Sequence, residues 1–473
     1  MAMFTTKTIV SVHETDQKIR SANLSTTELH SLFEIERCVR WIMERNLKKV
    51  CLQFPDNLLC FSANVTSCLE AELGFKLYIL GDGTYGSCCV DEIAAQHIGA
   101  DAVIHFGHYC LSPTARLPVL YIFEKRQIDV TSFVSNMRER FSDPATKILL
   151  LYDVAFRHAI GAITQQLSES YPHLAVSKLL TDEVNQNENY SILGRTFKIE
   201  DELDKYQVVF IGPEGHCLET LIHEIPGCRF YIFDPAKHKS IEDYHHDRGR
   251  FHRRRMYLIE KVKHARTLGI LIGTLTVANY SAAVDRVKTL AKNVGKKCYI
   301  IAVGKPNVAK LANFPEVEVF VLVACPESSL LDSKEFFQPI VTMHEVELAL
   351  NSQYVWGEKH VTDFRTLLPG GCNYVAEKNS PDDYEVSHVS LIDGRLHSFQ
   401  KSSPEPEENQ HSTAISMKGD TTVSNPLVSH GLGLSSRSWT GLQQNLGETE
   451  VALCAPGLQG IPQKYTHEHY LDK

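Results

Sequence analysis

Short, almost uninterrupted apolar runs recur along the chain and alternate with stretches of helical periodicity. The first runs are VCLQF (50–54), KLYILGD (76–82) and ADAVIHFG (100–107), and helices are predicted near residues 57–72 and 90–99. A strand that is apolar on both sides is buried on both faces, which is typical of a parallel sheet covered by helices. We therefore expect an α/β fold.

The same order of elements returns twice further along the chain. Residues 147–168 and 206–216 supply a strand, a helix and a later strand, and residues 268–304 and 317–327 repeat this pattern. The repetition predicts three successive α/β units, a weak internal triplication. The predicted bounds are an arm over 1–30 and units over 31–143, 144–245 and 246–374.

Beyond about residue 375 the composition becomes polar and rich in Ser, Pro and Glu. Such a segment cannot bury enough apolar surface to offset the entropy of ordering, so residues 375–473 are predicted to be mostly disordered. One Trp and several leucines mark a short element at 435–447. It fits tail composition and a peptide that docks on the core equally well.

The overall charge and hydropathy exclude two classes of protein. A formal net charge of −9 argues against a nucleic-acid-binding protein. No apolar run approaches the roughly 18 residues that a membrane span requires, and the N-terminal residues lack a secretory pattern. We expect a soluble intracellular protein in which the 13 cysteines are reduced.

Cysteines follow three of the predicted strands, at the strand ends where parallel α/β sheets bind their ligands. Cys88 and Cys89 follow the second apolar run, Cys110 follows the third, and Cys325 follows a strand of the last unit. Three thiolates brought together could hold an iron–sulfur cluster and leave one iron free for a small molecule. Alternatively, each cysteine is a buried packing residue.

Two further features bear on this choice. The close C-x₂₋₄-C pairs that are common at zinc sites are absent. Gly81, Gly83 and Gly86 precede the Cys-Cys doublet and suggest a backbone held close to a neighbour. Because adjacent side chains usually diverge, only one cysteine of the doublet is expected to ligate.

Other candidate sites have weaker support. The basic segment 243–266 fits a solvated helix, a partner surface or an anion site. The loop at 273–281 lacks both the G-x-G-x-x-G pattern and a Walker lysine, which argues against a nucleotide site.

Several longer strings carry a family resemblance. LQFPDNLL, LGDGTYGSCCVDE, HFGHYCLSP, KLANFPEVEVFVLVACPE and SSRSWTGL closely resemble the second-subunit family of 2-(3-amino-3-carboxypropyl)histidine synthase. This eukaryotic complex begins diphthamide biosynthesis. The resemblance runs from about residue 31 to 370 and returns near 435–442.

The resemblance implies three Rossmann-like α/β domains with parallel sheets around a central [4Fe-4S] cluster held by three cysteines. In catalytic relatives the open iron binds S-adenosylmethionine, whose cleavage gives a 3-amino-3-carboxypropyl radical. That radical adds to a histidine of translation elongation factor 2. The reaction also implies a small electron-donor protein and a reductase.

The chain departs from the catalytic members of this family in the second unit. Arg195, within SILGRTFK, stands where they carry a ligand cysteine. A guanidinium stays protonated and cannot ligate iron. The resemblance therefore assigns the cluster to Cys89, Cys110 and Cys325, with Cys88 as the alternative to Cys89. Cys217 is the runner-up for the third ligand.

The missing ligand favours an accessory role. The expected function is a heterodimer with catalytic subunit 1, in which this chain's cluster helps to reduce the partner's cluster and S-adenosylmethionine binds at the partner. The alternatives are a metal-free scaffold and a subunit that itself cleaves S-adenosylmethionine. Apolar strand edges and the basic residues at 248–255 are both candidates for the partner interface.

Overall fold

The structure is a computed structural model. It describes residues 25–81, 87–114, 116–181, 188–237, 240–245, 247–331, 335–357, 359–377, 388–390, 394 and 396–397. These residues belong to one compact body that spans residues 1–407. The element expected at 435–447, and most of the tail expected from residue 375, lie outside the described residues.

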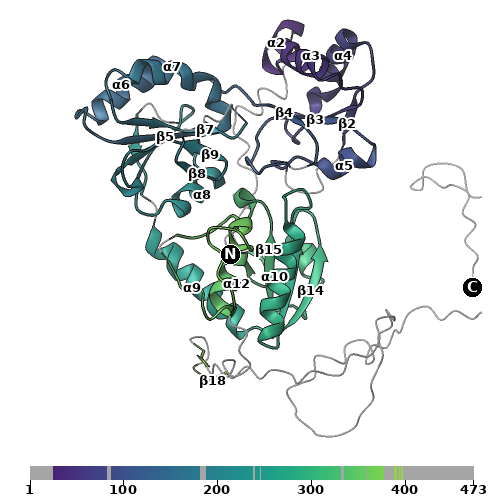
Figure 1. Ribbon diagram of the computed structural model, residues 1–473, viewed down its shortest axis with the longest axis vertical. Coiled ribbons are helices and arrows are strands. Elements are labelled where there is room, and N and C mark those ends of the chain that lie inside the picture. The colour runs from purple at the N-terminus through teal and green to yellow at the C-terminus, as the bar shows by residue number, and fades with distance from the viewer. Residues whose placement is uncertain are drawn as a thin grey trace, which may run out of the picture. The chain divides into compact units, whose positions relative to one another are not determined.

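Three separate sheets, parallel except for one short edge strand, confirm the expected α/β class (Figure 1). The first sheet has the order β2 (Tyr78–Leu80), β1 (Val50–Gln53), β3 (Ala102–Phe106), β4 (Val119–Ile122). The second has the order β12 (Glu242–Asp243), β11 (Arg229–Phe233), β10 (Gln207–Ile211), β5 (Ile148–Tyr152), β6 (Leu174–Val176). The third has the order β14 (Lys297–Ala302), β13 (Thr267–Ile272), β15 (Val319–Val323), β16 (Ile340–Val341).

The three sheets share one topology. In each, the first strand in the chain lies between the second and the third, and the fourth strand follows the third. The second sheet adds the antiparallel strand β12. It also carries an insertion after β6, a small antiparallel sheet of β7 (Lys178–Leu179), β9 (Arg195–Phe197) and β8 (Tyr190–Ile192). The common order agrees with an internal triplication, while the exact unit bounds stay a prediction.

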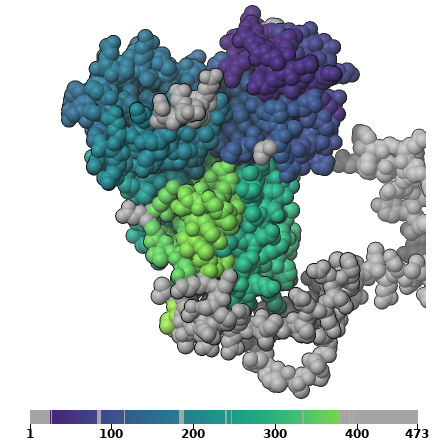
Figure 2. Space-filling model, in the orientation of Figure 1, coloured from purple at the N-terminus to yellow at the C-terminus, as the bar shows by residue number. Residues whose placement is uncertain are grey.

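Helices cover the sheets, and Figure 2 shows that the surfaces of the three parts meet. The described helices are α2 (Thr26–Leu32), α3 (Ile35–Glu44), α4 (Ser62–Leu73), α5 (Glu92–His97), α6 (Val130–Arg140), α7 (Arg157–Leu167), α8 (His216–Glu224), α9 (Arg248–His264), α10 (Tyr280–Asn293), α11 (Val308–Leu311) and α12 (Met343–Leu350). None of these described helices is long and apolar enough to cross a membrane.

Helix α2 begins inside the segment that was expected to be a flexible arm. Ser25 accepts a hydrogen bond from the Glu28 backbone, and the Glu28 side chain accepts one from the Ser25 backbone. This capping box satisfies N–H groups that would otherwise lack partners at the start of the helix. The local sequence therefore supports a helix where hydrophobic periodicity alone gave no signal.

The burial of the central strands explains why the apolar runs predicted them correctly. Every residue of β1, β3, β5 and β15 is buried, because helices or neighbouring parts of the chain cover both faces. A central strand buried on both sides carries no polar alternation.

Helix α12 anchors the third unit through buried ion pairs. Glu345 accepts a hydrogen bond of 2.9 Å from Arg255 of α9, and Glu347 accepts one of 2.7 Å from Arg286 of α10. Arg255 belongs to the basic segment proposed from sequence as a solvated or partner-facing surface, yet only 8% of it is exposed. Part of that basic character is therefore structural.

Two buried histidines beside this ion pair should make the fold sensitive to acid. His344 and His360 lie with their Nδ1 atoms 3.0 Å apart. Burial lowers the pKa of His344 to about 4, and burial together with nearby positive groups, including Arg255, lowers that of His360 well below its usual range. Both titrate near 6.5 when unfolded, so the unfolded state binds more protons as the pH falls below 6.5, and stability is lost.

Lowering the pH from 7 to 5 should therefore reduce the free energy of unfolding by about 2 kcal/mol for each histidine. Urea denaturation at the two pH values measures this change. The variant His344→Gln/His360→Gln should lose less stability between these pH values. An equal loss in the variant and the wild type would show that other groups cause it.

Candidate metal centre

Four cysteines from two distant parts of the chain form one buried group. The Sγ atoms of Cys88, Cys89, Cys110 and Cys325 all lie within 4.8 Å of one another. The closest pairs are Cys88 with Cys325 and Cys89 with Cys110, each at 3.7 Å. All four candidates from sequence are thus brought together at the carboxyl ends of strands of the first and third sheets.

The doublet does not behave as expected from sequence. The Sγ atoms of Cys88 and Cys89 are 4.0 Å apart, and both face the same group. The expectation that the two side chains diverge is wrong here, because the doublet lies in a turn and not in a strand. The geometry admits either residue, or both, as a ligand.

Backbone contacts hold the doublet in this turn. The buried Gln53, at the end of β1, donates from Nε2 to the Cys89 carbonyl at 2.8 Å and accepts from the Asp91 N–H at 2.8 Å. The Cys110 N–H donates to the Cys88 carbonyl at 3.1 Å. The crowding inferred from the glycines is not seen at Gly81, where an added Cβ would meet nothing within 4 Å; Gly83 and Gly86 lie outside the described residues.

A histidine ties the three units together beside the thiols. His108 Nε2 lies 2.7 Å from Glu327 Oε1, and His108 Nδ1 lies 4.0 Å from Asp153 Oδ2. Burial would lower the pKa of His108, but the two carboxylates outweigh it and raise the pKa to about 10. The protonated ring donates a hydrogen bond from Nε2 to Glu327 and lies within ion-pair distance of Asp153, so its charge links loops that follow β3, β5 and β15.

The thiols influence one another's protonation. Hydrogen bonding among the sulfurs, first with Cys110, and burial raise the pKa of Cys88 and of Cys89. The neighbouring thiols instead lower the pKa of Cys325, because they can donate hydrogen bonds to its thiolate. One thiolate supported by several thiols is an arrangement that a metal ion can enter with release of the remaining protons.

Arg195 and Cys217 lie outside this group. Arg195 is buried in β9 and donates from an η nitrogen to Cys217 Sγ at 3.2 Å. Burial, opposed by Arg195, raises the pKa of Cys217 to about 12, which disfavours the thiolate that a metal needs. The geometry therefore gives no support to Cys217 as a ligand.

Gly194 supports the loop that carries Cys110. It has a φ of +73°, and an added Cβ would lie 2.3 Å from the Cβ of Leu111 and 2.6 Å from its carbonyl oxygen. Gly194→Ala should lower the free energy of unfolding by about 2–4 kcal/mol, through left-handed strain and overpacking.

Urea denaturation measures this loss. Gly161→Ala is the matched control, because Gly161 lies inside α7 with nothing within 4 Å of its added Cβ. The control should gain about 0.5–1 kcal/mol. Equal stability of the two variants would contradict the packing argument.

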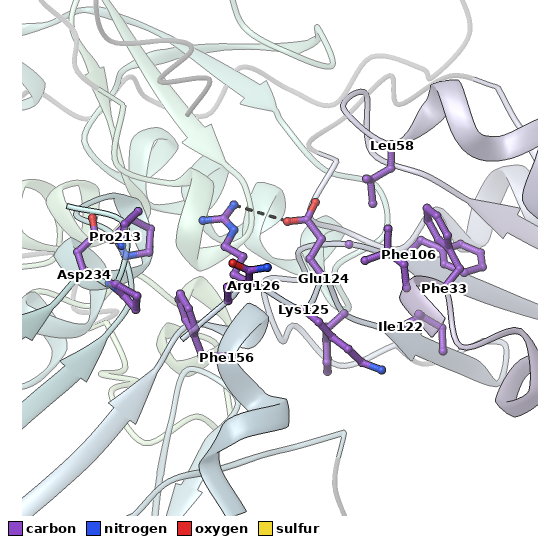
Figure 3. A pocket seen from close by; sticks show the side chains of 16 residues that line it. Phe33, Leu58, Phe106, Ile122, Glu124, Lys125, Arg126, Phe156, Pro213 and Asp234 are labelled. Atoms are coloured by element: carbon purple, nitrogen blue, oxygen red, sulfur yellow. Dashed lines mark hydrogen bonds and ion pairs between the residues drawn. The ribbon is translucent and has the colours of Figure 1, made fainter. Parts of the chain in front are cut away.

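A separate cavity of about 450 Å³ lies near the ends of β3, β4 and β11 (Figure 3). Phe33, Phe106 and Phe156 contribute to its mostly apolar wall, and Glu124 and Arg126 form an ion pair of 3.6 Å within it. None of the described residues that line this cavity is a cysteine, so it is distinct from the four-cysteine group.

Comparison with known proteins places this geometry in a family. Residues 54–361 match the model of a family described as putative diphthamide synthesis protein. This segment contains all four grouped cysteines. The chain belongs to this diphthamide synthesis family. Curated relatives named 2-(3-amino-3-carboxypropyl)histidine synthase subunit 2 include those of Danio rerio, 40% identical over 93% of this chain and 92% of the relative, and of Homo sapiens, 36% identical over 93% and 94%.

Solved structures agree with the diphthamide synthesis fold. The crystal structure of Dph2 from Pyrococcus horikoshii with a 4Fe-4S cluster covers 73% of this chain and 95% of that one, with a TM-score of 0.53 and 23% identity. A second structure of the same protein gives a TM-score of 0.52. The family assignment made from sequence motifs is confirmed, and the fold is that of Dph2.

The polar residues that support the thiols in this family member carry no motif that singles them out in the sequence. Gln53, His108, Asp153 and Glu327 were not proposed as site residues. Gln53 is the last residue of β1. The other three follow the carboxyl ends of strands: His108 follows β3, Asp153 follows β5 and Glu327 follows β15. That position was the available signal, since ligand sites in parallel sheets form at these ends.

Proposed function

We propose that this chain is the accessory subunit of the diphthamide synthase and holds a [4Fe-4S] cluster through Cys89, Cys110 and Cys325, with Cys88 able to supply a fourth thiolate. The supporting observation is the buried group of four Sγ atoms within 4.8 Å. A cluster bound there would accept and pass on single electrons. Relatives carry the name of a synthase subunit, and the Pyrococcus neighbour carries such a cluster.

The residues present suit this cofactor. Iron–sulfur clusters take thiolate ligands, and their potentials depend on burial and on hydrogen bonds to the sulfurs. Cys89, Cys110 and Cys325 are buried, and the hydroxyl groups of Ser112 and Ser328 lie 3.3 Å from Cys110 and 3.8 Å from Cys88 respectively. Gln53 holds the loop that carries Cys88 and Cys89.

The fourth sulfur favours an accessory role over independent catalysis. With three thiolates one iron remains open to a substrate, whereas four thiolates satisfy all four irons. A cluster without an open iron transfers electrons but binds no S-adenosylmethionine. The presence of Cys88 beside the other three, together with Arg195 in the second unit, therefore supports electron transfer to the partner's cluster.

In this proposal the catalytic work belongs to the partner. Subunit 1 binds S-adenosylmethionine, and the heterodimer transfers its 3-amino-3-carboxypropyl group to a histidine of translation elongation factor 2. A small electron-donor protein and its reductase supply electrons through this chain. The complex acts in the cytoplasm.

Metal analysis of the heterodimer tests the cluster. The full-length chain is coexpressed with a partner whose own cluster cysteines are replaced, and the complex is purified without oxygen. About four irons per heterodimer and a reduced-cluster EPR signal after dithionite are expected.

Two outcomes would overturn the proposal. An assembled complex without metal would make this chain a scaffold. One zinc per chain in place of iron would make the site structural, because four thiolates also suit a tetrahedral zinc ion.

A further inference from the structure

We propose that the bare edges of the first and third sheets, strands β2 and β14, bind the partner subunit through its own α/β sheet. The inference rests on the heterodimer of the proposed function and adds the surface that forms it. From sequence, apolar strand edges and the basic segment at 248–255 are both candidates for this interface.

Both edge strands expose large apolar side chains. Tyr78 and Ile79 of β2 are 42% and 39% exposed, and Tyr299 and Ile300 of β14 are 52% and 47% exposed. Consecutive residues of a strand point to opposite faces of the sheet. The edges are therefore open on both faces, although the strands of parallel sheets are normally covered on both.

The second sheet provides an internal comparison. Its strand β6 holds the same topological position as β2 and β14, next to the first strand of its sheet. No residue of β6 is exposed, and Ala175 packs in one cluster with Ile192 and Phe197 of the inserted antiparallel sheet. Where the chain supplies its own cover, this edge has no exposed residue; among the described residues the first and third sheets carry no such insertion.

The exposed residue pairs have the same sequence in both edge strands and occupy equivalent positions in the two sheets. β2 lies in KLYIL and β14 in KCYII, so the same Tyr-Ile dipeptide occupies the bare edge in both units. The opposite edges are covered, since both residues of β16 are buried and none of β4 is exposed. A single exposed apolar residue is ordinary, but matched pairs on equivalent edges indicate a binding surface.

The two edges are placed to meet one partner. Lys305, just after β14, lies 3.3 Å from Asp56, just after β1, so the two sheets approach each other beside these edges. Figure 1 shows β2 and β14 on the same side of the described body.

The chemistry of the surface defines the partner. An edge strand offers unpaired N–H and C=O groups that another strand can satisfy. Side chains exposed on both faces also need apolar cover on both faces, which a sheet with its own helices supplies. A second chain of the same α/β architecture, the partner subunit, meets both requirements. The basic segment is less suited, because Arg255 is already buried against Glu345.

Charged substitutions on the edges test the proposal. Tyr299→Glu/Ile300→Lys and Tyr78→Glu/Ile79→Lys leave the net charge unchanged and should each weaken the heterodimer at least about 100-fold, as expected for buried apolar anchors. Affinity is measured with the tagged partner subunit by surface plasmon resonance. The matched control is Met256→Lys/Tyr257→Glu on α9, where the exposed fractions are 47% and 46%; it should bind as the wild type does.

Two readings keep folding separate from binding. Each variant is checked for a wild-type circular dichroism spectrum and for retained iron. Both should be unchanged, because the substituted residues lie outside the four-cysteine group. Amide hydrogen exchange in the wild-type heterodimer should also show protection of β2 and β14. Wild-type affinity of both edge variants, or loss of binding in the α9 control alone, would overturn the proposal; a folded heterodimer without iron would instead remove the cluster and leave the interface standing.

Discussion

Replacing Cys325 by alanine should reduce the iron of this chain from about four atoms to less than about one, while the heterodimer still assembles. Cys325 is 1% exposed, and it is the member of the group that the third sheet contributes. The other three thiols come from loops of the first sheet. Without Cys325 all remaining sulfurs come from the first sheet. The side of the cluster that faces the third sheet would then have no thiolate ligand.

Iron analysis and EPR after anaerobic purification measure this loss. Cys217→Ala is the matched control, because Cys217 is also a thiol of the same chain, at the start of α8, yet lies against Arg195 and outside the group. The control should keep its iron. Retention of iron by Cys325→Ala with loss in Cys217→Ala would contradict the ligand set. Elongation factor modification at the wild-type rate by the Cys325→Ala complex would contradict the electron relay.

Replacing Cys88 by alanine should preserve most of the iron but open one iron of the cluster. In the wild type, four thiolates would hold all four irons. The variant would hold one iron without a thiolate, and such an iron is readily removed by mild oxidation. Iron loss after ferricyanide should therefore be at least about tenfold faster in Cys88→Ala, the lower end of what a lost supporting group costs a metal site.

The appearance of a three-iron EPR signal follows this reaction over time. Cys60→Ala is the control, because Cys60 is an exposed thiol outside the group. Fast conversion of the wild type itself would show that one iron is already open, and that only three cysteines ligate. That result would favour a subunit able to bind S-adenosylmethionine.

The sequence was most informative where burial is complete. Apolar runs such as VCLQF predicted β1 because a strand covered on both faces leaves no polar alternation, and the repeated order of elements predicted three sheets. It was less informative at β14, where Tyr299 and Ile300 look like core residues but are exposed. The sequence pattern of an apolar strand is the same whether this chain or a partner covers it.

The site could be located but not assembled from sequence. Strand-end positions singled out the four cysteines, because ligands bind at the carboxyl edge of parallel sheets. The common direction of Cys88 and Cys89 depends on a turn held by Gln53, and the tie from His108 to Glu327 spans 219 residues. Contacts of that range follow from tertiary packing and leave no local pattern.

The distance along the chain between the thiols has a consequence for biogenesis. Cys88 and Cys325 are 237 residues apart in sequence, although their sulfurs touch. During synthesis the first three thiols emerge long before the fourth, so an intact site exists only after the third sheet has folded onto the first. A cluster of the kind proposed could then be inserted only after the chain has been synthesised beyond β16, and its oxidative loss would remove a covalent link between the first and third sheets.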